Sequence, residues 1–336
     1  MKIIDLFSGI GGFSLGFQRA GYQFTEHYFS EIDKHAIANY KYNFPNAKHI
    51  GNIKTIQPAD LAGADIITFG SPCQDFSLAG KRAGLKGSKS SLIEYAIALI
   101  ACVRPSVFIW ENVKGAFSSN ARADFWAIIK ALTNIGGYTI EWQLLNTSWV
   151  LPQNRERLYL IGHLAGQSEQ GVFPITEDDC LPTTKTQSQS QTTISTTLKA
   201  NGNMNADDTY IIPKKASTLT AGGKSGGLHS DMTVIRQLPR GKNKGADLKI
   251  CPTISSNAFQ ENNLLCGIRR LTEIECERLQ GFPDNWTQYG NYKGKIKRIS
   301  KTNRYKLIGN AVTVDIVELI AKRLNFSAHL TDKVTK

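Results

Sequence analysis

From residue 1 to about residue 163, short apolar runs alternate with segments in which apolar residues recur at helical spacing. Such alternation predicts a doubly wound α/β sheet. The strand-like runs are Ile3–Phe7, Tyr22–Ser30, Asp65–Phe69, Val107–Trp110, Thr139–Asn146 and Leu158–Gly162. The helical patterns are Phe13–Ala20, Ala36–Phe44, Leu92–Val103 and Phe125–Leu132.

The pattern changes near Ala165. From there to about Cys266 the chain is rich in Thr, Ser, Gln, Asn and Gly, and the stretches 196–212, 217–235 and 252–265 weakly resemble one another. Each carries a Gly/Asn-rich polar stretch that ends in a strand-like apolar run. A disordered linker is one interpretation, with 187–191 as a candidate. The regular recurrence of apolar runs instead favours a small, loop-rich β domain inserted in the larger α/β domain.

Helical patterns resume after the polar segment. Thr272–Leu279 is predicted to be a helix in which Thr272 is the N-cap and Glu275 completes a capping box. Val314–Leu324 is a second amphipathic helix. We therefore divide the chain into residues 1–164, residues 165–266, and residues 267–336, which return to the first part.

The chain is basic, with a formal net charge of +12 and a pI near 9.4. Such a balance favours a polyanionic partner. Lys and Arg gather at Lys81–Lys89, Arg236–Lys244 and Lys293–Arg304, which also contain Gly, Asn or Ser and are therefore interpreted as surface loops. They form either a solvated basic face or a surface that contacts phosphates.

The sequence lacks the features of exported and membrane proteins. No run approaches the ~20 apolar residues of a membrane span, and the first residues form a short strand rather than a signal peptide. We expect a cytosolic protein with reduced thiols. Its six cysteines include no Cys-x-x-Cys pair, so neither a disulfide framework nor a zinc site is indicated, and we expect no metal.

A glycine-rich turn follows the first predicted strand, in "DLFSGIGGFSLGF" (5–17). Between a strand and a helix, Gly9, Gly11 and Gly12 let the backbone approach a ligand closely. Glu31 follows at the end of the next strand, which is the layout of a Rossmann nucleotide site. Because Phe7 and Ser8 stand where a dinucleotide fingerprint would begin with glycine, we expect a different adenosine ligand, with Phe7 covering the adenine.

Polar residues also follow the later strands. Cys73, in "GSPCQDFS", comes directly after a strand, at the sheet edge where ligands bind in such folds. A thiolate there is a nucleophile if nearby cations or helix amides lower its pKa. Glu111 ends the next strand, and Arg155 and Arg157 precede another. Taken one at a time, Cys73 is interpreted as a buried thiol, Glu111 as a helix-capping acid and the two arginines as surface residues. Taken together, they predict one pocket.

Several segments follow one another along the chain: "DLFSGIGGF", "SEID", "GNI", "GSPCQDFS", "ENV", "QNRER", a variable segment, "RRLTEIECERLQGFP" (269–283) and "YKLIGNAVTVDI" (305–316). In these segments and in their order, the chain resembles the DNA cytosine-5 methyltransferases along almost its full length. The resemblance implies a Rossmann-like methyltransferase sheet that binds S-adenosylmethionine in residues 1–164. It also implies a target-recognition domain in residues 165–266 and a cytosine in duplex DNA as the methyl acceptor.

The resemblance also assigns roles to single residues. It implies Cys73 as the nucleophile at cytosine C6, Glu111 bonding N3, Arg155 bonding O2 and Arg157 supporting them, after the base has flipped out of the duplex. The implied cofactor residues are Phe7, Gly9, Ile10, Gly11, Gly12, Glu31, Ile32, Asn52, Ile53, Pro72, Leu92, Asn310, Ala311 and Val312. Candidate DNA contacts are Lys81, Arg82, Arg236, Arg240 and Lys242.

Two positions depart from the family pattern. Asn52 stands where the family usually has Asp, which accepts a hydrogen bond from the adenine amino group; the Asn side-chain oxygen can still accept it. Ile32 stands where an aromatic residue often lies against the adenine, so it can only pack there. None of the implied catalytic positions departs.

Other functions remain open at this stage. One branch of the family acts on tRNA, although the variable segment of roughly 100 residues favours DNA, whose major groove needs a dedicated reading surface. A catalytically silent DNA-binding module is a third possibility, but it predicts loss of the pocket residues. We expect a monomer in a bacterial cytosol or a phage-infected host, with a cognate restriction endonuclease as a possible partner.

Overall fold

The structure is a computed structural model of the chain. It describes residues 1–71, 92–118, 122–180 and 271–327, together with the backbone of the short strands 235–237, 246–248, 251–252, 263–265 and 269–270. Within these ranges no helix is long and apolar enough to cross a bilayer.

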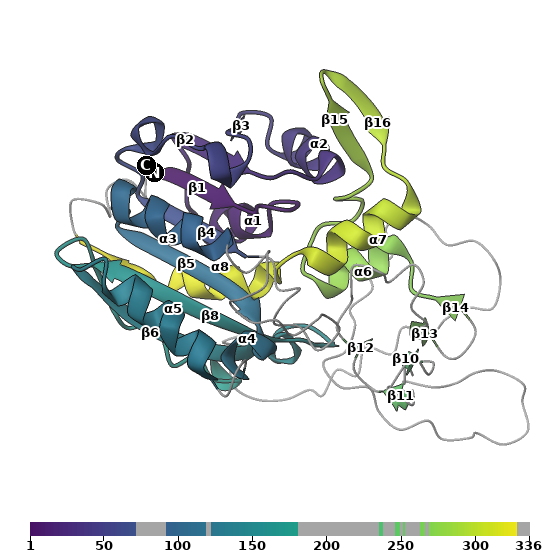
Figure 1. Cartoon of the computed structure of the whole chain (residues 1–336). Helices are drawn as coiled ribbons and strands as arrows, with labels where there is room; N and C mark the ends of the chain where they lie inside the picture. The colour runs from purple at the N-terminus through teal and green to yellow at the C-terminus, as the bar shows by residue number, and fades with distance from the viewer. Residues whose placement is uncertain are drawn as a thin grey trace, which may run out of the picture.

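The central element is a seven-stranded sheet in the order β3-β2-β1-β4-β5-β8-β6 (Figure 1). The five strands β3, β2, β1, β4 and β5 are parallel to one another. Strand β8 lies between β5 and β6 and is antiparallel to both. The bounds are β1 Lys2–Leu6, β2 Glu26–Ser30, β3 Lys48–His49, β4 Ile66–Gly70, β5 Val107–Val113, β6 Tyr138–Asn146 and β8 Glu156–Leu164. This confirms the α/β prediction, although β2 begins later than expected and β8 is longer.

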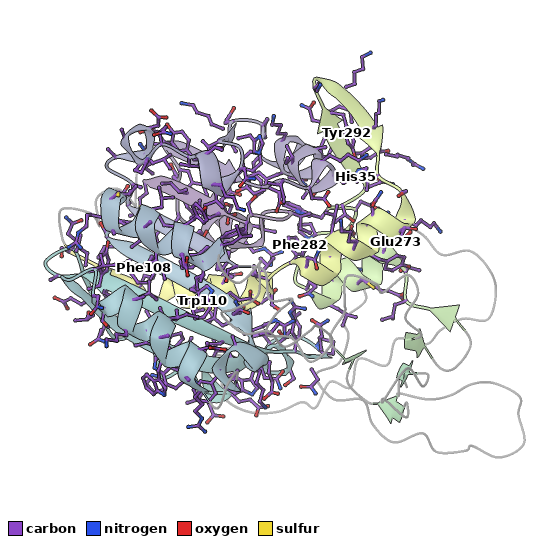
Figure 2. The ribbon with its side chains drawn as sticks, viewed as in Figure 1. His35, Phe108, Trp110, Glu273, Phe282 and Tyr292 are labelled. Carbon is purple, nitrogen blue, oxygen red and sulfur yellow. The ribbon has the colours of Figure 1, made fainter. Side chains whose placement is uncertain are left out.

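Helices cover both faces of this sheet (Figure 1). Side chains alternate along each strand, so Ile67 and Phe69 face one layer while Ile66 faces the other. The first layer contains α3 (Leu92–Val103), α4 (Lys114–Ser118) and α5 (Ala123–Thr133), and the second contains α1 (Gly12–Arg19) and α8 (Val314–Lys322). Helix α2 (Lys34–Asn43) joins β2 to β3. The fully buried Phe108 and Trp110 of β5 lie in the first layer (Figure 2).

The C-terminal part of the chain completes this core. Helix α8 packs directly on α1, and a Cβ atom added at Gly16 would lie 2.5 Å from a methyl carbon of Val317. Glycine therefore sets the close approach of the two helices. Beyond α8, β17 (Asn325–Phe326) pairs with β9 (Ser168–Glu169). Residues separated by about 300 positions in the sequence thus share one hydrophobic layer.

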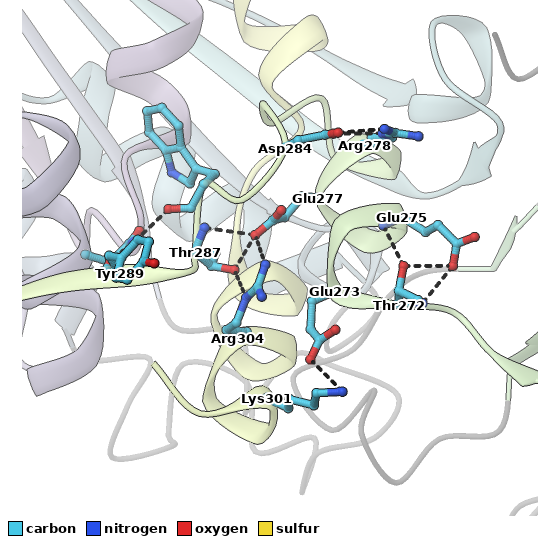
Figure 3. Close-up of polar contacts among 12 residues, drawn as sticks. Thr272, Glu273, Glu275, Glu277, Arg278, Asp284, Thr287, Tyr289, Lys301 and Arg304 are labelled. Carbon is cyan, nitrogen blue, oxygen red and sulfur yellow. Dashed lines mark hydrogen bonds and ion pairs between the residues drawn. The ribbon is translucent and has the colours of Figure 1, made fainter. Parts of the chain in front are cut away.

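Residues 271–310 connect the short strands to the core. The predicted capping box is confirmed at the start of α6 (Glu273–Leu279), where Thr272 and Glu275 bond reciprocally (Figure 3). The prediction of a loop over Lys293–Arg304 is wrong. A hairpin, β15 (Tyr289–Tyr292) and β16 (Lys295–Arg298), leads into α7 (Lys301–Asn310). Packing of the hairpin on α2 stabilises strands that have little apolar pattern of their own.

Part of the predicted inserted domain falls within the described residues. The short strands form a four-stranded sheet, β11 (Ala246–Leu248), β10 (Ile235–Gln237), β13 (Asn263–Leu265) and β14 (Arg269–Arg270), and β12 (Cys251–Pro252) pairs with β7 (Gln153–Asn154). The weak repeats at 196–212 and most of 217–235 lie outside the described residues.

A buried ion pair links α6 to α7. The Arg304 guanidinium donates from Nη2 to Glu277 Oε1 at 2.9 Å and from Nε to the Thr287 hydroxyl at 2.9 Å, and Thr287 in turn donates to Glu277 (Figure 3). The Glu277 side chain is completely buried. This cluster fixes the chain between the short strands and the C-terminal helix.

We predict that Arg304→Met destabilises the protein by about 3–5 kcal/mol, because it leaves the Glu277 carboxylate buried without its cation. The matched control is Arg278→Met, which removes an ion pair with Asp284 that is partly exposed on both sides and should cost under about 1 kcal/mol. Urea unfolding followed by circular dichroism measures both. Equal losses in the two variants would contradict a special role for the buried pair.

Candidate active site

The glycine-rich turn lies at the carboxyl edge of β1, as predicted. Phe7, Gly9 and Gly11 all have positive φ, and Gly11 is the N-cap of α1. The turn is held by a bond from the Ser8 amide to the Ser30 carbonyl of β2 and by one from Gly11 to Ser8. Its conformation is therefore fixed by β2, and glycine suits the left-handed backbone at positions 9 and 11, whereas Phe7 adopts such a backbone with a side chain.

Glu31 holds this turn from the neighbouring strand. Its Oε2 accepts the Gly9 amide at 3.0 Å, and its Oε1 accepts the amides of Ile32 and Asp33 at 2.7 and 2.9 Å. A carboxylate has about four acceptor positions, so capacity remains for a ligand hydroxyl. Glu31 thus organises the turn and still suits the nucleotide-binding role predicted for it.

A buried polar cluster lies directly beneath the turn. Asp5 accepts from Ser14 at 3.2 Å, from Tyr40 at 3.1 Å and from Thr68 at 3.1 Å. His27 Nε2 lies 3.0 Å from the Ser14 hydroxyl and 2.7 Å from the Tyr40 hydroxyl. These five side chains come from β1, α1, β2, α2 and β4, so the cluster ties these five elements together.

Burial governs protonation in this cluster. It raises the pKa of Asp5 from 3.8 to about 7, against the three hydrogen bonds that favour the charged carboxylate. It also lowers the pKa of His27 from 6.5 to about 4, so the imidazole is neutral at physiological pH. With Ser14 and Tyr40 donating to Asp5, the geometry suits a His27 tautomer that carries its proton on Nε2.

The other predicted cofactor residues divide into two groups. Asn52 is exposed and its Oδ1 accepts the Lys54 amide at 3.1 Å, while Ile32 is 73% exposed at the end of β2. These side chains are accessible to a ligand. The second group consists of side chains that pack in the core. They are the buried Ile10, Ile53, Ala311 and Val312, together with Leu92 at the start of α3. Asn310 is exposed at the end of α7.

Strand β5 holds the segment that leads to Cys73. The Asn112 amide donates to the Ser71 hydroxyl at 3.0 Å, and the Trp110 indole donates to the same hydroxyl at 3.0 Å. Ser71 is buried two positions before Cys73. Neither Ser71 nor Asn112 was predicted as a site residue, although each lies within a segment, "GSPC" or "ENV", that was singled out.

Glu111 and Arg157 meet at this edge. Glu111 lies opposite Gly70 of β4 and Tyr159 of β8, and its Oε1 is 3.2 Å from Arg157 Nε. Burial raises the pKa of Glu111 above its usual range, while the charges of Arg157 and Arg155 oppose the rise. Of the four residues predicted to form one pocket, Glu111 and Arg157 are in contact, whereas Cys73 lies outside the described residues.

The Arg155 guanidinium bonds the backbone of another segment that was singled out in the sequence. Its Nη2 donates to the Ala311 carbonyl at 2.7 Å and its Nη1 lies 3.4 Å from the Gly309 carbonyl, so it joins "QNRER" to "LIGNAV". Nearby, the hydroxyls of Thr147 and Thr313 lie 2.8 Å apart, and Thr313 also bonds Gln280. Sequence analysis missed these two threonines and Gln280, which carry no charge and match no chemical pattern.

Several predicted residues lie outside the described part of the chain. They are Pro72, Cys73, Lys81, Arg82, Arg240 and Lys242. For Arg236 the structure gives only the backbone, in β10.

We predict that Asp5→Asn changes the pH dependence of stability. Because its pKa is raised, native Asp5 binds more protons than the unfolded chain between about pH 4 and pH 7, which lowers the free energy of unfolding as pH rises. His27, with its lowered pKa, has the opposite effect between about pH 4 and pH 6.5. The Asn variant should therefore gain stability with rising pH more steeply than the unmodified protein.

Urea unfolding at several pH values across this window measures the effect. Thr68→Val is the control, because it removes one hydrogen bond of the cluster but leaves the Asp5 carboxyl able to titrate. Parallel pH profiles for Asp5→Asn and the unmodified protein would show that Asp5 does not titrate in this window.

Comparison with known proteins places this site in a family. The model of the C-5 cytosine-specific DNA methylases matches residues 1–325. Type II methyltransferase M.Bsp6I of Bacillus sp. (strain RFL6) is 30% identical over 337 residues, covering 96% of this chain and 98% of that protein. Type II methyltransferase M.HaeII of Haemophilus aegyptius is 31% identical over 324 residues, covering 95% and 91%.

A solved structure supports the fold. The S. pombe Dnmt2 methyltransferase superposes with a TM-score of 0.60 at 18% identity, over 95% of this chain and 96% of that one. Since the family model spans nearly all of the chain, and relatives at about this identity align along it, the chain belongs to the C-5 cytosine-specific DNA methylases and is a DNA cytosine-5 methyltransferase.

Proposed function

We propose that the protein methylates C5 of a cytosine flipped out of duplex DNA, within a specific sequence, through a covalent bond between Cys73 and cytosine C6. The observation that carries this proposal is the meeting of β4, β5 and β8 at one sheet edge. There Glu111 contacts Arg157, and Asn112 holds Ser71 two residues before Cys73. An acid, a cation and the approach to a thiol thus converge.

Cys73 supplies the activation that cytosine needs. C5 is a poor nucleophile, and addition of the Cys73 thiolate to C6 gives an enamine whose electrons are directed out through C5. After C5 has gained the methyl group, it loses its proton, the electron pair re-forms the C5–C6 double bond, and the thiolate leaves C6. The anchoring of Ser71 by β5 supports a fixed approach for this thiol.

Glu111 is suited to protonate or bond cytosine N3 as the thiolate adds. A buried carboxyl with a raised pKa holds a proton closer to neutrality than an exposed one does. Arg157 is suited to keep this carboxyl in place. We assign the contact with cytosine O2 to Arg155, whose guanidinium is oriented by the carbonyls of residues 309 and 311.

S-adenosylmethionine supplies the methyl group in this family. The residues present fit its adenosine part: the turn at Phe7–Gly12 has amides and glycines at a strand end, Glu31 retains acceptor capacity, and Ile32 and Asn52 are accessible. We propose that Glu31 bonds the ribose, that Asn52 accepts from the adenine amino group, and that Phe7 and Ile32 pack on the adenine faces.

Target recognition is assigned to residues 165–266, which match none of the family segments singled out in the sequence. Their Thr, Asn, Gln, Lys and Arg side chains are donors and acceptors that read base edges in the major groove. Lys81, Arg82, Arg236, Arg240 and Lys242 are proposed to contact DNA. Since relatives are Type II methyltransferases, we further propose a monomer that acts beside a cognate restriction endonuclease in a bacterial cytosol.

We predict that Cys73→Ser abolishes methylation and leaves DNA binding largely intact, because only the covalent step needs a thiolate. Transfer of labelled methyl groups to duplex DNA and to tRNA, together with a gel-shift assay, measures both properties. Trapping on duplexes containing 5-fluorocytosine should give a covalent complex with the unmodified protein alone. Substantial turnover by the serine variant would refute the covalent mechanism, and labelling of tRNA alone would favour an RNA methyltransferase.

Glu111→Gln is the matched comparison for this experiment. It should slow methylation by roughly 10²-fold or more, the usual scale of a general acid–base group, but it should still allow slow turnover. Cofactor binding should change less than the rate. Unchanged activity would assign the N3 contact to another residue.

We predict that exchange of residues 165–266 for the corresponding segment of a relative with a known site transfers that site. Bisulfite sequencing of DNA from cells that express the chimera identifies the methylated sequence. The Cys73 chemistry and cofactor binding should persist, because the residues that form the sheet edge are retained. A folded, active chimera that keeps the original site would disprove the assignment of target recognition to this segment.

A further inference from the structure

The β15–β16 hairpin carries an unusual concentration of positive charge. Residues 289–301 contain five cations and no acidic residue. The cations are Lys293, Lys295, Lys297, Arg298 and Lys301. All five are exposed. The hairpin projects beyond α2, away from the central sheet (Figure 1).

These cations differ from other lysines in the described part of the chain. Lys114, Lys306 and Lys322 form ion pairs of 2.8, 2.5 and 2.5 Å with carboxylates. Among the described residues, none of the hairpin lysines 293, 295 and 297 has a carboxylate within ion-pair distance, and Lys301 is 3.9 Å from Glu273. The hairpin charge is therefore largely uncompensated by the protein.

The hairpin is rigidly mounted. The Asn39 amide of α2 donates to the carbonyls of Trp286 and Tyr289 at 2.8 and 2.9 Å, and the His35 ring lies 2.6 Å from the Tyr292 hydroxyl (Figure 2). The turn between the strands has positive φ at both central residues, Lys293 and Gly294, which is the geometry of a tight two-residue hairpin. The backbone of the hairpin is therefore already ordered before a partner binds.

The spacing of the charges fits a nucleic-acid backbone. Lys295 and Lys297 are two residues apart on one strand, hence about 7 Å apart, which is close to the rise of two base pairs. Arg298 lies over the Tyr289 ring at 5.8 Å, which leaves its planar guanidinium presented on an aromatic support. The interval between Lys295 and Lys297 therefore matches phosphates that lie two base-pair steps apart along a duplex strand.

The position of the hairpin determines which part of the duplex it can reach. The hairpin is supported by α2, which follows β2 in the chain. Glu111 lies on β5, and β2 and β5 are three strand spacings, or about 14 Å, apart in the sheet. The target base must enter near β5. The hairpin is thus displaced sideways from the reacting base, toward DNA that flanks it.

We propose that the β15–β16 hairpin is a second DNA contact, which binds phosphates of the duplex flanking the recognition site and reads no bases. The proposal rests on duplex DNA as the substrate. It gives the enzyme affinity for long DNA and retention near a site after methylation, because such contacts are independent of sequence. The recognition sequence itself is set elsewhere.

The test compares two triple variants with equal change of charge. The first is Lys293→Gln, Lys295→Gln and Lys297→Gln. The control is Lys48→Gln, Lys130→Gln and Lys322→Gln, three exposed lysines of the α/β domain away from the hairpin. Fluorescence anisotropy measures binding to random-sequence duplexes of about 40 and about 12 base pairs at several salt concentrations, with an RNA duplex of the longer length in parallel.

We expect the hairpin variant to bind the long DNA about 10-fold or more weakly than the control variant does. Its slope of log affinity against log salt should be smaller by about 2–3, because each lost phosphate contact removes about 0.9. Binding of the short duplex, the methylated sequence and the rate at saturating DNA should not change. Equal binding of long DNA by both variants, or an equal loss on both lengths, would overturn the proposal.

Two further outcomes are distinguishable. A loss confined to the RNA duplex would make the hairpin an RNA-binding surface and would refute the DNA assignment. Methylation of genomic DNA by the unmodified protein is measured in the same preparation. If it methylates no DNA, the proposed function fails, whereas the binding comparison still decides whether the hairpin contacts duplex phosphates.

Discussion

The buried cluster around Asp5 is the constraint on which the cofactor half of the molecule depends. A carboxyl, three hydroxyls and an imidazole lie together in the core and satisfy one another across β1, α1, β2, α2 and β4. Buried polar groups cost stability unless they are paired, so these elements can adopt few other arrangements. The glycine turn lies directly above Asp5, and Glu31 fixes it from β2. The cluster also anchors α2 through Tyr40, and the opposite side of that helix supports the basic hairpin. One set of hydrogen bonds therefore positions both the cofactor turn and the proposed flanking contact.

The sheet edge to which we assign catalysis depends on contacts between segments that are far apart in the sequence. Ser71 is held by β5, Glu111 meets Arg157 from β8, and Arg155 bonds carbonyls that precede α8. The close packing of α8 on α1 at Gly16 fixes where those carbonyls lie. The Glu277–Arg304 pair fixes the route by which the chain returns. The sheet edge is thus assembled from segments near both ends of the chain, all of which lie within the residues 1–325 that the family model matches.

Charge is divided between two kinds of role in this enzyme. At the sheet edge, arginines lie next to a buried carboxyl, where they oppose the rise in the pKa of Glu111. On the hairpin, cations are exposed and lack carboxylate partners among the described residues, so they remain available to a polyanion. The first arrangement suits chemistry on a single base, whereas the second suits binding that is independent of sequence. The proposed function, methylation of a cytosine within a specific sequence of long DNA, uses both.

The sequence by itself determined the elements with strong local signals. Periodicity located six of the seven strands of the α/β sheet, with shifted ends at β2 and β8, and it missed the two-residue β3. The glycine turn and the capping box at Thr272 lie where they were predicted. The contact of Glu111 with Arg157 also agrees with the sequence, because the end of β5 and the start of the antiparallel β8 lie at one edge of the sheet. Only the tertiary structure decided what depends on distant partners. The acid within the first strand, Asp5, is visible in the sequence, but its hydroxyl partners come from three other elements and its raised pKa comes from burial. Arg155 bonds carbonyls about 155 residues away. Residues 293–304 were predicted to form a basic loop, because the strand and helix that they form have weak apolar periodicity. Helix α2 supplies the packing surface that stabilises the hairpin.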